Sequence, residues 1–188
     1  MTRSVFALEM CLRFDAELTA GLRAMLTAET SNPSPRHLWH LWSQAATGIL
    51  QRRAAWRTGC WDFWEEPAKA QTDFQMWVKG LMTEEGARKA ASPAPEPYRG
   101  SERFMTITMA CLLVKGSAAE RAMAGVCDIP EAYLWHQASF DRILRGIPHI
   151  NFSVVDRATL YLIPKEDDWA LTPEDLRDPK FEYLRPIV

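Results

Sequence analysis

The sequence predicts an α+β fold, a mostly antiparallel sheet of about four strands with helices packed on one face. Several segments alternate apolar and polar residues at the period of a strand, and others place apolar residues at helical spacing. The 188 residues are 47% hydrophobic and 24% charged, which is typical of a globular protein that needs no disulfide or metal to fold. We therefore expect a single domain over residues 1–188.

The first half of the chain is expected to form a strand followed by helices. Residues 5–14 have an apolar residue at every even position, which predicts a strand with one buried face. Asp15 can cap the helix that follows, and a second helix is expected from Pro35. A third is expected over about 68–91. The aromatic segment 56–64 has no clear period, and we interpret it as the end of the second helix and its turn.

The second half is expected to supply the rest of the sheet. Prolines within about 92–101 predict an irregular connection inside the domain, after which residues 104–115 have the pattern of a strand. Capping boxes that begin at Ser117 and Asp128 predict two helices, the second of which ends at Gly146.

The chain is expected to end with a hairpin and a short helix. Apolar residues alternate in 150–154, Asp156 and Arg157 have the polarity of a tight turn, and 158–163 has the pattern of the returning strand. Thr172, which precedes a proline and two acids, is placed to cap a terminal helix.

Composition and charge narrow the classes of partner. A net charge of -2 and a pI near 6.1 give no global field for a polyanion, which argues against nucleic acid. Glu9 interrupts the apolar start before a signal peptide could form, and no segment is long and apolar enough for a transmembrane helix, so we expect a cytoplasmic protein. The four cysteines lack Cys-x-x-Cys spacing and are expected to be reduced core thiols.

The sequence presents no familiar catalytic constellation. Pairs of carboxylates are adjacent along the chain, such as Glu65 and Glu66, and are typical of solvated surfaces. His136, Ser139 and Asp141 would splay around one helix rather than form a proton relay. We therefore assign no catalytic residue and no cofactor. An active site of an unfamiliar kind remains an alternative.

His37 and His40 are the candidate metal ligands. A spacing of three on a helix puts both imidazoles on one side, within reach of one ion. A metal site normally needs more ligands, and no Asp or Glu occurs between Pro33 and Trp61. The alternative interpretation is a role at the surface or at the edge of the core.

Tryptophans and arginines in this acid-free stretch and just after it form a candidate binding surface. The chain has eight tryptophans, more than a core of this size usually needs, and both residue types are enriched at interfaces. The alternative is that the tryptophans lie in the core and the arginines on the solvated face. The candidate surface consists of Trp39, Arg53, Trp56, Arg57, Trp61, Trp64 and Trp77.

Several segments, in their order along the chain, resemble a known family. They are Val5–Phe14, Leu38–Trp56, Ala70–Phe74, Phe104–Gly116, Leu160–Leu176 and the closing Tyr183-Leu-Arg-Pro-Ile. This order is similar to that of the domain-of-unknown-function family fifteen-seventeen of bacteria, cyanobacteria and chloroplasts, which includes a plant protein of acclimation to fluctuating light.

Two departures from that family bear on what the resemblance implies. Its members typically carry a glycine-rich segment and membrane-spanning helices before the domain. They also end the strand before the acidic turn on Trp-Thr-Pro, where this chain has Leu162, Ile163 and Pro164. The resemblance therefore implies the soluble domain alone, and it supplies no catalytic residues.

These observations favour a non-enzymatic protein-interaction or regulatory module that has a protein partner, and a homodimer is compatible with them. One alternative is a small-molecule or metal-binding protein, or an enzyme, with a pocket between the sheet and the Trp-rich helices. Another is a peripheral binder of anionic surfaces, including a membrane, through the helix rich in Arg and Trp.

Overall fold

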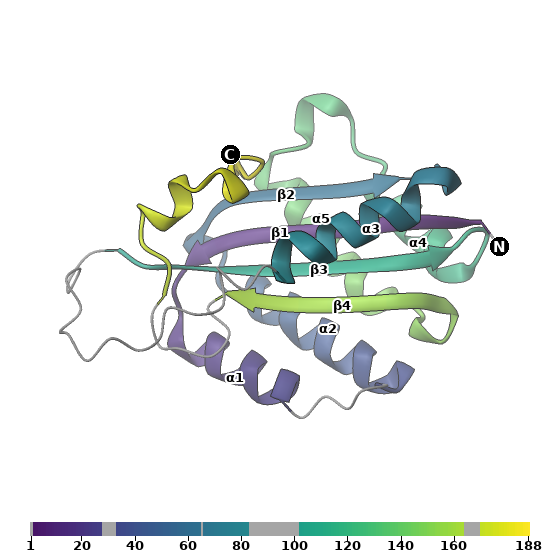
Figure 1. Cartoon of the computed structure of the whole chain (residues 1–188), viewed down its shortest axis with the longest axis horizontal. Coiled ribbons are helices and arrows are strands. Elements are labelled where there is room, and N and C mark those ends of the chain that lie inside the picture. Colours follow the sequence, from purple (N-terminus) through teal and green to yellow (C-terminus); the bar gives the residue numbers. More distant parts are fainter. Residues whose placement is uncertain (1, 28–32, 65, 83–101, 164–169) are drawn as a thin grey trace.

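The computed structural model describes residues 2–27, 33–64, 66–82, 102–163 and 170–188. Within them, five strands form one antiparallel sheet in the order β4-β3-β1-β2-β5, flanked by five α-helices (Figure 1). The strands are β1 (Arg3–Arg13), β2 (Trp56–Trp64), β3 (Phe104–Val114), β4 (Val155–Ile163) and β5 (Arg185–Pro186). The helices are α1 (Ala16–Thr27), α2 (Pro35–Leu50), α3 (Pro67–Met82), α4 (Ala118–Cys127) and α5 (Gln137–Gly146). The α+β class is confirmed, with five strands in place of about four.

The first strand of the chain lies in the middle of the sheet. β1 pairs along its whole length with β3, from Arg3 opposite Val114 to Arg13 opposite Phe104. On its other side β1 pairs with β2, beginning with Val5 opposite Trp64. The backbone groups of β1 therefore have partners on both sides, and the two halves of the chain are joined through it.

The main core lies between one face of the sheet and helices α1, α2, α4 and α5. The even-numbered residues of β1, such as Phe6 and Leu8, point into it and are buried. They meet Trp42 of α2 and Phe140 of α5, neither of which has any exposed surface. Burying each such side chain contributes about 1.5–3 kcal/mol, so this core is the main source of stability.

Helix α3 packs on the opposite face of the sheet, whereas the sequence predicted helices on one face only. Val5 and Ala7 of β1 and Ala110 of β3 form a second core with Ala70 and Phe74 of α3. Figure 1 shows α3 crossing the near side of the sheet. The small alanines let the helix approach closely, and β1 is consequently buried on both faces.

The segment 56–64, interpreted above as a helix end and turn, is in fact strand β2. Its backbone pairs with β1 on one side, and Thr58 and Gly59 also face β5. Aromatic residues favour strands, but apolar residues occur at both odd and even positions of β2, so no period of two was visible.

The predicted hairpin at 150–163 is also wrong. Residues 152–154 form a 3-10 turn, and Asp156 and Arg157 belong to β4 itself, whose pairing with β3 shifts register at Asp156 instead of turning back. Among the described residues, β4 pairs with a strand on one side only, so its exposed end tolerates the polar pair that suggested a turn.

Helix ends are less well predicted than helices. Asp15 and Ser117 cap α1 and α4 as expected, accepting from Leu18 N at 2.7 Å and from Glu120 N at 3.1 Å. In contrast, the capping box expected at Asp128 is followed by a 3-10 turn over 131–133, and α5 begins only at Gln137.

The last described segment, 170–188, forms short turns where a terminal helix was predicted. Thr172 caps Asp175 N at 3.1 Å, but only 3-10 turns follow, over 175–177 and 179–181. The proline-rich connection and the part of the third helix beyond Met82 lie outside the described residues. In the described part of the chain, no helix combines the length and the apolarity needed to cross a membrane.

Candidate functional site

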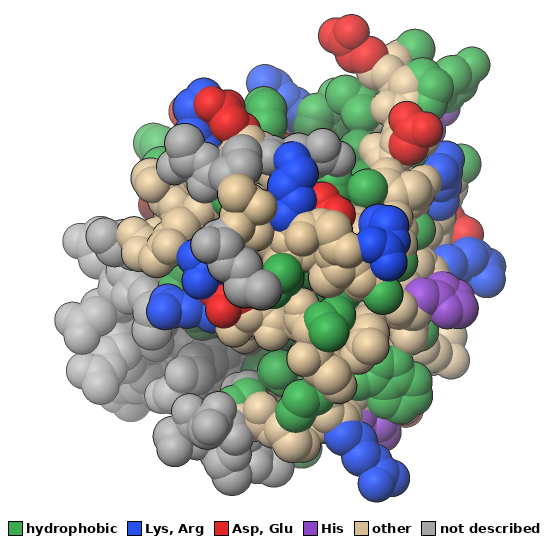
Figure 2. All heavy atoms as spheres, turned by 90° about the vertical axis from the view of Figure 1, so that its right-hand side faces the viewer, with side chains coloured by type: hydrophobic (Ala, Val, Ile, Leu, Met, Phe, Trp, Pro, Cys, Tyr) green, Lys and Arg blue, Asp and Glu red, His purple; other side chains and the backbone are tan. Residues whose placement is uncertain are grey.

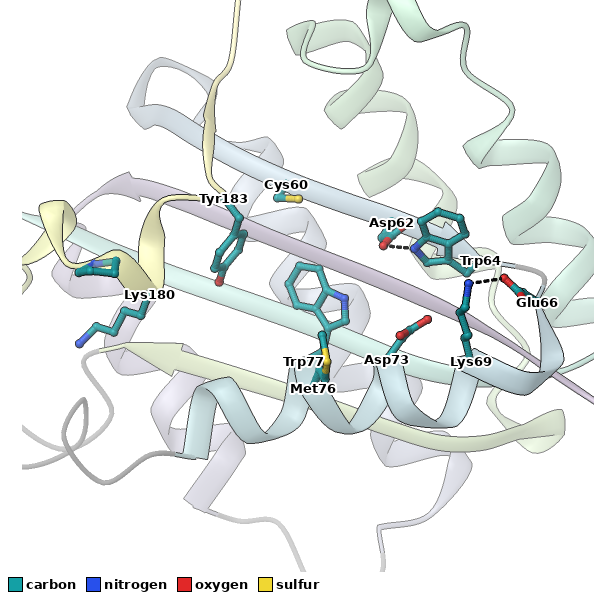
Figure 3. A pocket seen from close by; sticks show the side chains of 11 residues that line it. Cys60, Asp62, Trp64, Glu66, Lys69, Asp73, Met76, Trp77, Lys180 and Tyr183 are labelled. Carbon is teal, nitrogen blue, oxygen red and sulfur yellow. Dashed lines mark hydrogen bonds and ion pairs between the residues drawn. The ribbon is translucent and has the colours of Figure 1, made fainter.

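A cavity of about 610 Å³ opens on the α3 side of the sheet. Its walls are β2, α3 and the segment 179–183, which come from distant parts of the chain (Figure 3). One end is mainly apolar and is lined by Cys60, Met76, Trp77 and Tyr183. The other end carries charge and is lined by Asp62, Trp64, Glu66, Lys69 and Asp73.

Strand β2 supplies three of these side chains through its alternation. Successive residues of a strand point to opposite faces. Cys60, Asp62 and Trp64 therefore point to the α3 side, while Trp61 and Phe63 pack against the main core. A one-residue shift of β2 against β1 would exchange the two sets, so the register of this pairing determines which residues line the cavity.

Helix α3 and the C-terminal segment supply the other walls. Lys69, Asp73 and Trp77 are spaced four apart and therefore share one side of α3. The 3-10 turn Pro179–Phe181 directs the chain so that Tyr183 lies against Trp77. Their rings meet edge to face, with centroids 5.8 Å apart and an interplanar angle of 83°. Such a contact holds the two rings in a defined orientation.

Glu9 lies behind the Tyr183 end of the cavity, in the centre of the sheet. It has no exposed surface, and Tyr183 Oη donates a hydrogen bond of 2.6 Å to its Oε2. Its other oxygen, Oε1, has no hydrogen-bond partner within the described structure. Burial raises the pKa of Glu9 from 4.5 to about 6, opposed in part by the Tyr183 hydrogen bond and by the nearby Thr108 hydroxyl group. The carboxyl group therefore exchanges a proton near neutral pH.

Two carboxylates mark the charged end of the cavity. The indole nitrogen of Trp64 donates a hydrogen bond to Asp62 Oδ2, which fixes the ring beside the carboxylate (Figure 3). Burial raises the pKa of Asp62, and the nearby charge of Asp73 adds to the effect. The two carboxylates are thus close enough to repel each other.

The lysines of the cavity already have acidic partners. Lys69 Nζ lies 3.0 Å from Glu66 Oε2, an ion pair drawn in Figure 3. Lys180 Nζ lies 3.6 Å from Asp178 Oδ2 and 5.3 Å from the centre of the Phe181 ring. Each lysine of the cavity therefore already has a carboxylate beside it.

The thiol of Cys60 in the cavity has low reactivity at neutral pH. Burial, together with the charges of Asp62 and Glu9, raises the pKa of Cys60 to about 11, so the group is a neutral thiol at pH 7. Cys11, Cys111 and Cys127 are buried, and all four cysteines are free of disulfides. The nucleophilic form of Cys60 is scarce under these conditions.

The structure does not gather the predicted tryptophans on one surface. Trp56 is buried, and Trp61 packs against the main core. Trp39, Trp56 and Trp61 each donate from the indole nitrogen to a backbone carbonyl of the chain, at 2.8, 2.9 and 2.9 Å. Trp64 and Trp77 alone among the five line the cavity. The tryptophans thus divide between structural positions and the candidate site.

The predicted arginines meet acids from other parts of the chain. Arg53 Nε lies 2.6 Å from Asp141 Oδ1, and Arg57 Nη2 lies 3.0 Å from Glu102 Oε1. The stretch 33–61 has no acidic residue of its own, but in the folded protein acids from other parts of the chain lie beside its arginines. On the side of the molecule seen in Figure 2, basic side chains are likewise interspersed with acidic and apolar ones.

The two candidate metal ligands lie on α2, away from the cavity. His37 is half-buried and His40 is exposed. Among the residues that the structure describes, no group of three or more His, Cys, Asp or Glu side chains is placed to hold a metal ion. His37 and His40 therefore have no third ligand in that part of the molecule.

Sequence reasoning missed Glu9, Tyr183, Asp62 and Asp73 as site residues. For Glu9 a signal was present, because it is the only charge between the two ends of an otherwise uncharged strand. Such a carboxylate indicates a partner elsewhere in the chain. Tyr183, Asp62 and Asp73 become site residues only because the fold brings β2, α3 and the C-terminal segment together.

Comparisons with known proteins give this chain no relative. No family model matches it, and neither curated proteins nor solved structures provide a match. The resemblance to family fifteen-seventeen stays a prediction, and the functional argument rests on the geometry of the cavity.

Proposed function

We propose that this protein binds a small organic molecule in the cavity between β2, α3 and the segment 179–183. The observation that carries the proposal is a cavity of about 610 Å³ with an aromatic end and a carboxylate end. Sites for small molecules typically measure about 300–1,000 Å³ and combine apolar walls with a few polar groups that orient the ligand. The cavity has that size and that mixture.

The buried Glu9 supports the same location. A carboxyl group with one unpartnered oxygen inside a sheet destabilises the fold, so a protein built for stability alone would favour an apolar residue there. Groups with a perturbed pKa concentrate at functional sites. Glu9 holds Tyr183, and Tyr183 is part of the cavity wall, so the carboxyl group positions one side of the site.

The distribution of tryptophans favours the cavity over a broad protein-binding face. The indoles of Trp39, Trp56 and Trp61 are engaged by the chain's own carbonyl groups. Trp64 is 50% exposed and lies at the rim of the cavity, where a ligand could reach it.

The proposal can be tested by fluorine NMR of protein labelled with 5-fluorotryptophan. The eight tryptophans give eight reporters, and the variants Trp64→Phe and Trp77→Phe assign the two in the cavity. The protein is screened against a fragment library that contains cationic, neutral and anionic compounds. We expect hits that shift the Trp64 and Trp77 resonances and leave the Trp42 resonance, deep in the main core, in place.

Variants of two tryptophans provide the control. Trp77→Ala removes a wall of the cavity and should weaken binding of the hits at least about tenfold, whereas Trp39→Ala, on α2, should leave it unchanged. A library that yields no compound shifting Trp64 or Trp77, or hits that bind equally well to Trp77→Ala, would contradict a ligand site in this cavity.

A further inference from the structure

The charge balance of the cavity is uneven. Glu66 neutralises Lys69, and Asp178 neutralises Lys180, through the ion pairs described above. Asp62 and Asp73 are left, and within the described residues neither forms an ion pair with a Lys or Arg side chain. The charged end of the cavity therefore holds three carboxylates, those of Asp62, Glu66 and Asp73, against the single cation of Lys69, whose charge also acts on Asp73.

These carboxylates stand on facing elements. Asp62 comes from β2 and Asp73 from α3, so they approach each other across the charged end (Figure 3). The charge of Asp73 disfavours ionisation of Asp62, because like charges repel in a partly buried site. A positive charge placed between them would interact favourably with both and would remove the repulsion.

The aromatic rings of the cavity also favour a positively charged ligand. Trp64 is held beside Asp62 by its hydrogen bond, and Trp77 projects from α3 one turn after Asp73. The face of an indole attracts cations, and sites that bind quaternary ammonium groups are commonly built from tryptophan and tyrosine rings with nearby carboxylates. Trp77 also stacks edge to face on Tyr183, which continues the aromatic wall toward the apolar end.

From this arrangement we infer that the ligand is an organic cation, an amine or a quaternary ammonium compound with an apolar body. The inference rests on the proposed function. The cationic group would lie between Asp62 and Asp73 beside Trp64, and the body would extend along Trp77 toward Cys60 and Tyr183.

Two other classes of ligand, organic anions and metal ions, fit the cavity less well. An anionic ligand would need a free lysine or arginine, but both lysines of the cavity are paired, and Arg185 lies near Cys60 at the opposite end from the carboxylates. A metal ion would need three or more His, Cys, Asp or Glu ligands, and the described residues offer no such group.

Three probes of similar size and different charge test the inference. They are benzyltrimethylammonium, benzyl alcohol and benzenesulfonate, each titrated into the 5-fluorotryptophan protein while the Trp64 and Trp77 resonances are followed. We expect the cation to bind at least about tenfold more tightly than the neutral probe, and the anion to bind most weakly.

The double variant Asp62→Asn/Asp73→Asn separates charge from shape. It should weaken binding of benzyltrimethylammonium at least about tenfold and leave that of benzyl alcohol unchanged. Asp128→Asn/Asp156→Asn is the matched control, since it removes two carboxylates outside the cavity and should affect neither probe. Unshifted resonances of the other tryptophans check that each variant keeps its fold.

The outcomes distinguish this inference from the proposal on which it rests. Binding of benzyl alcohol as tight as that of the cation, or cation binding that survives the Asp62→Asn/Asp73→Asn change, would overturn the cation site and leave a ligand cavity in place. If no probe and no library fragment shifts Trp64 or Trp77, both the cation site and the proposed function are wrong.

Discussion

Glu9 is a carboxyl group in a place where the fold gains nothing from its charge. It lies in the central strand, has no exposed surface and receives one hydrogen bond, from Tyr183. Burial favours the neutral form, which explains why its pKa rises to about 6. Because the same side chain fixes Tyr183, its protonation links the stability of the sheet to the position of the cavity wall.

This link predicts a pH dependence of stability that Glu9→Gln should remove. The folded state holds the proton more tightly than the unfolded state, since the pKa is about 6 against an ordinary value of 4.5. Relative to the ionised form, protonated Glu9 therefore makes the fold more stable, an effect that is fully present below about pH 4.5 and is lost as the pH rises through about 6. Relative to Glu9→Gln, the wild-type free energy of unfolding should fall by about 2 kcal/mol across this range.

Urea denaturation of both proteins at several pH values between 4 and 8 would measure the difference, and titration of other groups cancels in it. The exposed Glu131→Gln is the control, since it makes the same chemical change at the surface instead of inside the sheet. A flat difference for Glu9→Gln would mean that Glu9 titrates as it does in the unfolded chain.

At the scale of elements, the contact between α4 and α5 depends on a glycine. A Cβ atom at Gly146 would lie 2.7 and 2.9 Å from the two Cγ atoms of Val126. These distances are shorter than carbon atoms tolerate, so the end of α5 can approach α4 only because position 146 lacks a side chain.

Gly146→Ala should consequently destabilise the protein by about 1–3 kcal/mol, because the added methyl group overpacks the contact. The matched change Gly125→Ala, in α4 with no atom within 4 Å of the new Cβ, should be neutral or stabilise by up to about 1 kcal/mol. Thermal or urea unfolding measures both. If Val126→Ala does not relieve the effect of Gly146→Ala in the double variant, the clash is not its cause.

Elements with a strong period could be predicted from the sequence, and those without one could not. β1, β3 and α2 show their pattern along the chain and were confirmed. β2 was missed because it carries apolar residues on both faces, one covered by the main core and the other lining the cavity beside Asp62. Since β2 forms a wall of the site, missing this strand also meant missing the site.

At the scale of the whole molecule, most of the sheet consists of pairings between distant parts of the chain. β1 pairs with β3 about a hundred positions later, as in Arg3 opposite Val114. β1 also has partners on both sides and packed residues on both faces. It cannot be exposed without disrupting the rest of the fold.

The strands should therefore differ in the rate at which their backbone amides exchange hydrogen with solvent. We expect amides of β1 to exchange only through global unfolding, and those of β4, which pairs on one side, to exchange faster through local opening. Exchange followed by mass spectrometry, with peptides covering 3–13 and 155–163, would show the order. Equal protection of the two strands would indicate that β4 has a further partner in solution.

The origin of the cavity walls has a consequence for protein synthesis. Residues 60–77 leave the ribosome long before residues 179–183, yet both are needed to enclose the site. A nascent chain could thus pair β1 with β2 and place α3 while the site is still open on its third side. For the ligand proposed above, capture would begin only when Tyr183 reaches Glu9, after the other two walls of the cavity are in place.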